Sequence, residues 1–179
     1  FRINRDFLRC RRALDGDFFL HSEHHSLPRA AAEASRIRSL PNESATQALG
    51  RELASVLKPG MVVWLDGELG AGKTTLVRAL LRALGHDGPV KSPTYTLVEV
   101  YVVSSLYLYH FDFYRFNEEE EFAEAGLGEY FCADALCLVE WPSKAGAYLP
   151  PAELVLELRA ASESGCQCLN QLCCQNAAS

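Results

Sequence analysis

The spacing of apolar and polar residues divides the chain into three parts. Residues 41–158 alternate between segments of helical and of strand-like spacing, whereas residues 1–40 follow neither pattern for long and residues 160–179 are small, polar and rich in cysteine. Alternating strands and helices are typical of an α/β sheet flanked by helices. We therefore predict a single α/β domain at 41–158, a poorly ordered N-terminal extension at 1–40 and a divergent C-terminal tail at 159–179.

Three helices are predicted inside this domain. The first begins after a cap at Asn42 or Ser44 and ends before the Pro-Gly pair at 59–60. The second covers residues 73–84 and is followed by a glycine, a common helix end. An acidic stretch at 117–127 predicts the third helix.

Five runs rich in apolar, aromatic and β-branched residues predict the strands of the sheet. Side chains alternate along a strand, so His110 and Asp112 fall on one face of the third run. The fourth run is apolar until it reaches Glu140. The five runs cover residues 61–66, 94–103, 106–116, 135–142 and 152–159.

The segment GELGAGKTT at 67–75 contains the complete pattern G-x-x-x-x-G-K-[ST], placed between a predicted strand and a predicted helix. Its glycines let backbone N–H groups turn toward phosphate oxygens, and the helix start adds free donors. Lys73 would neutralise the β- and γ-phosphates, and the Thr74 hydroxyl would ligate Mg²⁺. A glycine-rich turn without a ligand is the alternative, but motif and context together favour a P-loop.

Two acids are candidates for a second role at this site. Glu140 follows an apolar strand, where a metal-associated acid is expected; the alternative is a surface carboxylate at a strand end. Asp112 lies inside an aromatic strand, where an unpaired buried acid would cost several kcal/mol. It either serves the site or forms a salt bridge with Arg115.

The base of the nucleotide is indicated by an absence in the sequence. GTPases of the Ras type recognise guanine with an N-K-x-D segment, and no asparagine of this chain is followed by lysine. ATP is therefore favoured over GTP.

Composition limits the possible partners and compartments. The net charge is −6, which argues against nucleic-acid binding through bulk electrostatics. No apolar run reaches the roughly 20 residues that span a bilayer, and the arginines near the N-terminus precede no signal-like apolar segment. We predict no membrane partner and a cytoplasmic location. The seven cysteines are expected to be reduced thiols, with zinc binding by the tail as a weaker alternative.

Four motifs together resemble the TsaE family, the ATPases of tRNA threonylcarbamoyladenosine biosynthesis. They are GELGAGKTT at 67–75, VKSPTYTLVEVY at 90–101, YHFDFYR at 109–115 and LVEWP at 138–142. The resemblance covers residues 41 to about 158 and implies a P-loop NTPase-type sheet flanked by helices.

The resemblance also implies residue roles. Lys73, Asp112 and Glu140 would be catalytic, and Thr74 and Glu140 would be associated with Mg²⁺. The SPTY segment at 92–95 would be a loop that senses the nucleotide. Residues implied to bind ATP are Glu43, Thr46, Gly67, Leu69, Gly70, Ala71, Gly72, Lys73, Thr74 and Thr75.

The implied function is a magnesium-dependent ATPase required for threonylcarbamoylation of tRNA at adenosine 37. Its partners would be TsaD and TsaB homologues, and tRNA would be reached only indirectly through their complex. Two alternatives stay open. One is a nucleotide-binding regulatory module with negligible turnover, and the other is a small P-loop kinase.

Overall fold

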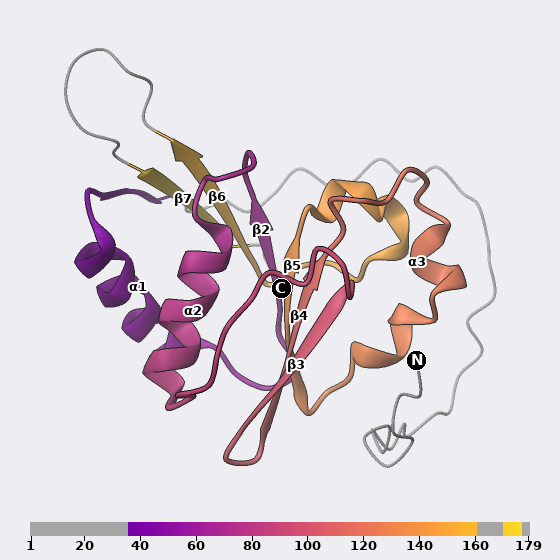
Figure 1. Cartoon of the computed structure of the whole chain (residues 1–179), viewed down its shortest axis with the longest axis horizontal. Helices are drawn as coiled ribbons and strands as arrows, with labels where there is room; N and C mark the ends of the chain where they lie inside the picture. Colours follow the sequence, from indigo (N-terminus) through magenta and orange to yellow (C-terminus); the bar gives the residue numbers. More distant parts are fainter. Residues whose placement is uncertain (1–35, 161–169, 177–179) are drawn as a thin grey trace.

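The computed structural model describes residues 36–160 and 170–176, which form a mixed seven-stranded sheet (Figure 1). The strand order is β1-β7-β6-β2-β5-β4-β3. The central strands β6, β2, β5 and β4 are parallel, while β3, β7 and β1 join antiparallel at the two ends. The strands are β1 (Arg36–Leu40), β2 (Val62–Asp66), β3 (Val98–Val103), β4 (Leu106–Asp112), β5 (Ala135–Glu140), β6 (Leu154–Ala160) and β7 (Asn170–Asn176).

Two helices, α1 (Glu43–Val56) and α2 (Lys73–Leu84), lie together on one side of the sheet (Figure 1). The Asn42 side chain caps α1 by accepting the Ala45 N–H over 2.9 Å, as one of the two predicted caps would. The helices approach closely at Gly50, where a Cβ atom would lie 2.6 Å from the carbonyl carbon of Ala79. A side chain at position 50 would therefore separate α1 from α2.

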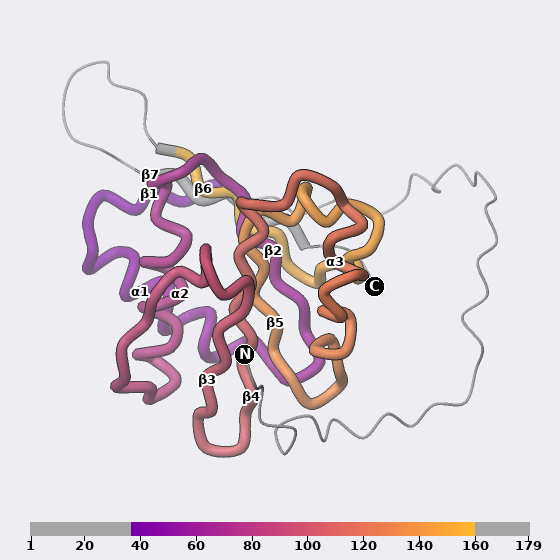
Figure 2. Tube along the Cα trace, turned by 45° about the vertical axis from the view of Figure 1, so that its right-hand side comes forward, coloured from indigo at the N-terminus to yellow at the C-terminus, as the bar shows by residue number. Residues whose placement is uncertain are grey.

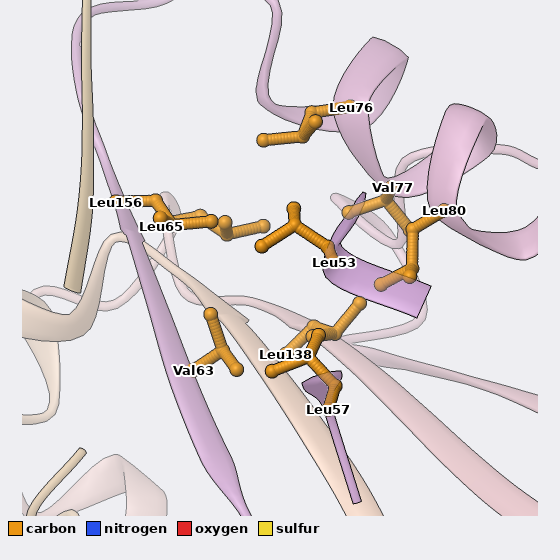
Figure 3. Close-up of a pocket in the computed structure, with 9 residues that line it drawn as sticks. All are labelled: Leu53, Leu57, Val63, Leu65, Leu76, Val77, Leu80, Leu138 and Leu156. Carbon is orange, nitrogen blue, oxygen red and sulfur yellow. The ribbon is translucent and has the colours of Figure 1, made fainter. Parts of the chain in front are cut away.

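The core on this side of the sheet is tightly packed. Figure 3 shows nine apolar side chains from α1, α2 and the central strands pointing toward one another: Leu53, Leu57, Val63, Leu65, Leu76, Val77, Leu80, Leu138 and Leu156. The space among them is about 10 Å³, room for at most one water molecule. This is the hydrophobic core, and it anchors α2 to the sheet.

The opposite face of the sheet is covered by the segment that contains α3 (Glu121–Glu124) and three short 3₁₀ turns, η2 (Leu127–Tyr130), η3 (Pro142–Lys144) and η4 (Gly146–Tyr148). Its core is aromatic. Phe111 of β4 stacks on Phe131 with ring centroids 5.0 Å apart, and Phe113 stacks on Phe116 at 4.8 Å. The β3–β4 hairpin extends beyond the rest of the sheet, at the end away from β1 and β7 (Figure 2).

The structure differs from the sequence prediction in three places. The acidic helix expected at 117–127 is only the four-residue α3, because Gly126 takes a left-handed conformation and the Glu121 carboxylate binds the N–H groups of Asn117 and Glu118 in a turn. Strands β1 and β7 lie in the segments predicted to flank the domain. Cys132 is disulfide-bonded, so the expectation of reduced thiols is wrong for this residue.

No helix within residues 36–160 and 170–176 is long and apolar enough to cross a membrane.

Candidate functional site

The glycine-rich loop connects β2 directly to α2. Gly67, Gly70 and Gly72 have positive φ angles of 144°, 82° and 98°, which L-residues rarely adopt. A Cβ atom at Gly67 would also lie 2.3 Å from the carbonyl oxygen of Leu158 in β6, so the loop packs against that strand. Gly72 caps α2 without a side-chain hydrogen bond, which leaves N–H groups of the first helical turn free for an anion.

Lys73 is the first residue of α2 and is folded into the loop. Its Nζ donates to the carbonyl oxygens of Gly67 at 2.7 Å and Glu68 at 3.1 Å. It also lies 4.2 Å from the ring centroid of Trp141. Burial lowers the pKa of Lys73 from its ordinary value, although the nearby charges of Glu140 and Asp112 act in the opposite direction. A phosphate would supply the compensating negative charge at short range.

The next residue, Thr74, faces the end of β5. Its hydroxyl donates to Oε1 of Glu140 over 3.0 Å. Glu140 is only 3% exposed, which rules out the alternative of a surface carboxylate. The structure thus brings together the hydroxyl and the carboxylate that the sequence assigned to Mg²⁺.

The register of the parallel pair β4–β5 explains why the acids meet α2. Asp112 lies opposite Glu140, and two residues earlier His110 lies opposite Leu138. Leu138 belongs to the core beneath α1 and α2, so alternation places all four side chains on that face. The face changes from leucine to polar residues where the strands reach the loop.

Asp112 holds the SPTY segment. Its Oδ2 accepts hydrogen bonds from the hydroxyls of Ser92 at 2.6 Å and Thr94 at 2.7 Å, while Oδ1 accepts the Tyr114 N–H at 3.1 Å. Arg115 instead lies over the Tyr95 ring, 4.0 Å from its centroid. Asp112 is therefore held by hydroxyl donors rather than by the alternative salt bridge to Arg115.

Other residues predicted to bind ATP lie on the second side of the loop: Glu43, Thr46, Gly70, Gly72 and Thr75. They line a pocket of about 400 Å³ between the start of α1, the loop and β6. Its volume suits a nucleoside, and its position adjoins the helix N-terminus expected to hold phosphates. The lining is Leu40, Pro41, Asn42, Glu43, Thr46, Gly70, Gly72, Thr75, Arg78 and Leu158.

Two residues of the predicted ATP set are placed differently. The side chain of Leu69 is 73% exposed and is not part of the pocket lining, whereas Ala71 is buried in the core. Neither side chain is positioned to contact a ligand in the pocket. Any contribution from these two positions would come from the backbone of the loop.

The donor set fits a magnesium nucleotide. Mg²⁺ prefers hard oxygen ligands and is usually held by one or two protein groups together with phosphates. Thr74 and Glu140 supply a hydroxyl and a carboxylate. No group of three or more His, Cys, Asp or Glu residues within 36–160 and 170–176 could hold a metal ion alone, so phosphate oxygens and water would complete the shell.

Sequence reasoning gave no role to His110, which is fully buried and contacts Glu140. The signal was available, because a histidine two residues before Asp112 shares its face. Trp141 directly follows Glu140 at the end of β5. It is partly exposed, has a left-handed backbone with φ of 58° and lies beside Lys73.

A strand, a Gly-Lys-Thr loop, a helix that begins at that loop and an acid from the neighbouring parallel strand define a P-loop-type fold. Residues 40–168 match the model of the family described as "Threonylcarbamoyl adenosine biosynthesis protein TsaE", and the chain belongs to this family.

Curated relatives and a solved structure agree with the assignment. The Haemophilus influenzae protein named "tRNA threonylcarbamoyladenosine biosynthesis protein TsaE" is 42% identical over 66% of this chain and 78% of its own length. The Bacillus subtilis protein of the same name is 39% identical over 68% and 76%. The crystal structure of B. subtilis YdiB superposes with a TM-score of 0.68 at 29% identity and covers 83% of this chain and 90% of that one.

Proposed function

We propose that this protein is a magnesium-dependent ATPase required for threonylcarbamoyladenosine modification of tRNA at adenosine 37, acting on a complex of TsaD and TsaB homologues in the cytoplasm. The observation that carries the proposal is the arrangement of Lys73, Thr74 and Glu140 at the phosphate loop of a TsaE-family chain.

The loop would bind the triphosphate through its backbone and Lys73. In the present arrangement Lys73 Nζ donates to two carbonyl oxygens of its own loop. Phosphate oxygens would replace these acceptors and stabilise the buried ammonium more strongly, because they carry full negative charge. The adenosine half would occupy the pocket beside Glu43 and Thr46.

Thr74 and Glu140 would hold Mg²⁺ against the phosphates. When bound, the ion would neutralise charge that develops on the phosphate oxygens. The hydrogen bond between the Thr74 hydroxyl and Oε1 of Glu140 would keep these two groups side by side at the ion.

Asp112 would connect the nucleotide to the SPTY loop. It lies opposite Glu140 in the sheet and is tied to Ser92 and Thr94, so a change at the γ-phosphate would reach this loop through one side chain. Tyr95 beside it is 83% exposed and could present the nucleotide state to a partner.

The family and the charge of the chain support the proposed partners. With a net charge of −6, the chain is poorly suited to bind tRNA by itself, so tRNA contact would fall to the TsaD–TsaB pair.

Phosphate release from ATP, measured with and without TsaD and TsaB homologues, tests the proposal. We expect magnesium-dependent release that the partners stimulate. Tight ATP binding without release in either condition would favour a regulatory module. Transfer of phosphate to an acceptor other than water would favour a kinase.

A further inference from the structure

His110 is a fully buried histidine in contact with the Glu140 carboxylate. Its Nε2 lies 2.8 Å from Oε1, the same oxygen that accepts the Thr74 hydroxyl. Because a carboxylate oxygen accepts, Nε2 carries the hydrogen of this bond. The other ring nitrogen, Nδ1, is buried and has no hydrogen-bond partner among the described residues.

The burial of His110 needs an explanation. The preceding residue on the same face of β4 is Leu108, and the residue opposite His110 on β5 is Leu138, both in the core. A leucine would fit the same pattern without leaving a buried ring nitrogen unpaired, which is unfavourable. Among the described residues, the one polar contact that the imidazole gains is with Glu140.

We propose that His110 is a positioning residue that fixes the Glu140 carboxylate for Mg²⁺. Two donors on different elements, His110 in β4 and Thr74 in α2, converge on Oε1. These two hydrogen bonds fix the rotation of the carboxylate and therefore also the position of its second oxygen, Oε2. Groups that orient a metal-associated residue in this way typically change metal affinity 10- to 100-fold when removed.

The inference rests on the proposed function only in taking Glu140 as the magnesium-associated acid. It adds that Glu140 binds Mg²⁺ well only when His110 of β4 holds its carboxylate. It also assigns His110 no contact with the nucleotide. A change at His110 should therefore alter the affinity for Mg²⁺ and leave the affinity for metal-free nucleotide unchanged.

Calorimetric binding of ADP, titrated with Mg²⁺ and repeated in EDTA, tests this. For His110→Leu we expect the Mg²⁺ concentration that half-saturates the strengthening of ADP binding to rise at least about 10-fold. ADP affinity in EDTA should stay within about 2-fold. His110→Gln, whose amide N–H can replace the Nε2 donor, should restore most of the Mg²⁺ affinity.

Two controls separate positioning from general damage. Tyr109→Phe alters the neighbouring buried residue on the opposite face of β4 and should leave the Mg²⁺ titration unchanged. In a Glu140→Gln background, His110→Leu should add little, because its effect passes through Glu140.

Each outcome bears on one claim. A His110→Leu chain that melts normally and titrates with Mg²⁺ like the wild type would overturn the inference. Equal losses of ADP affinity in EDTA and in Mg²⁺ would also overturn it. So would a wild-type chain whose ADP affinity does not change with Mg²⁺. Normal Mg²⁺-dependent binding without any ATP turnover would instead contradict the ATPase proposal alone.

Discussion

The hydroxyl of Thr74 donates a hydrogen bond to Oε1 of Glu140 over 3.0 Å, which joins the first turn of α2 to the last residue of β5. The two residues are separated by the β3–β4 hairpin and the aromatic segment, so only the folded sheet brings them together. This contact places a hydroxyl and a carboxylate at the glycine-rich loop, and the proposed magnesium site depends on it.

Thr74→Val keeps the shape of the side chain and removes its oxygen. We expect the Mg²⁺ requirement for phosphate release to rise at least about 10-fold, because one proposed metal ligand and one donor to Glu140 are lost. Thr74→Ser keeps the hydroxyl and is the matched control, expected to stay near the wild type. Equal Mg²⁺ titrations for the two variants would remove Thr74 from the metal site.

Ser92→Ala and Thr94→Val each remove one hydroxyl from Asp112. Hydrogen bonds to charged groups contribute about 1.5–3 kcal/mol, so each change should loosen the SPTY loop and raise amide hydrogen exchange at residues 92–97. Thr96→Ala is the control, since its hydroxyl donates instead to the Glu99 carboxylate in an exposed hydrogen bond. Unchanged exchange in the first two variants would show that Asp112 does not hold this loop.

Gly67→Ala tests the contact between the loop and β6. The new Cβ would lie 2.3 Å from the carbonyl oxygen of Leu158 in a backbone with positive φ, so we expect a loss of at least about 2 kcal/mol in the free energy of unfolding. Gly70→Ala also has positive φ but nothing within 4 Å, and it should cost about 1 kcal/mol. Chemical denaturation would measure both. A smaller loss at Gly67 than at Gly70 would contradict the close packing of the loop against β6.

Cys137 provides a pH-dependent prediction. Burial raises the pKa of its thiol to about 12. The unfolded chain loses this proton near the ordinary value of about 8.5, while the folded chain keeps it, so this group's stabilising contribution falls as pH rises from about 8.5 toward 12. At pH 8, iodoacetamide should modify Cys137 only after unfolding, as read by peptide mass spectrometry. Rapid modification of the native chain would show that this strand is accessible.

Much of the fold near the site could be predicted from local sequence. The Asn42 cap, the exact run of α2 between two glycines and the central strands depend on short-range spacing and capping, which the sequence displays directly. Strands β1 and β7 were missed because they are short of apolar residues and depend on pairing with distant partners. The prediction of a long acidic helix was wrong because the Glu121 carboxylate accepts the N–H groups of Asn117 and Glu118 in a turn. The spacing of the residues alone does not reveal this turn.

The candidate site also has a part that local sequence predicts and a part that depends on contacts between distant residues. The glycine-rich loop and the acid at the end of β5 follow from motifs, since each lies beside a clear strand or helix. The contact of His110 with Glu140 and the binding of Asp112 by two hydroxyls depend on the β4–β5 register and on a loop conformation. The sequence showed that His110 and Asp112 lie on the same face of their strand, but not that this face contacts Glu140.

The most direct test is reconstitution of threonylcarbamoyladenosine on tRNA with TsaD and TsaB homologues and this chain as the only proposed ATPase in the mixture. We predict sustained formation of the modified nucleoside with the wild-type chain and none beyond the background with Lys73→Ala, because that change removes the charge held inside the phosphate loop. The two proteins should melt at similar temperatures. Equal yields with the wild-type and Lys73→Ala chains would contradict the assignment of an ATP-driven role to this loop.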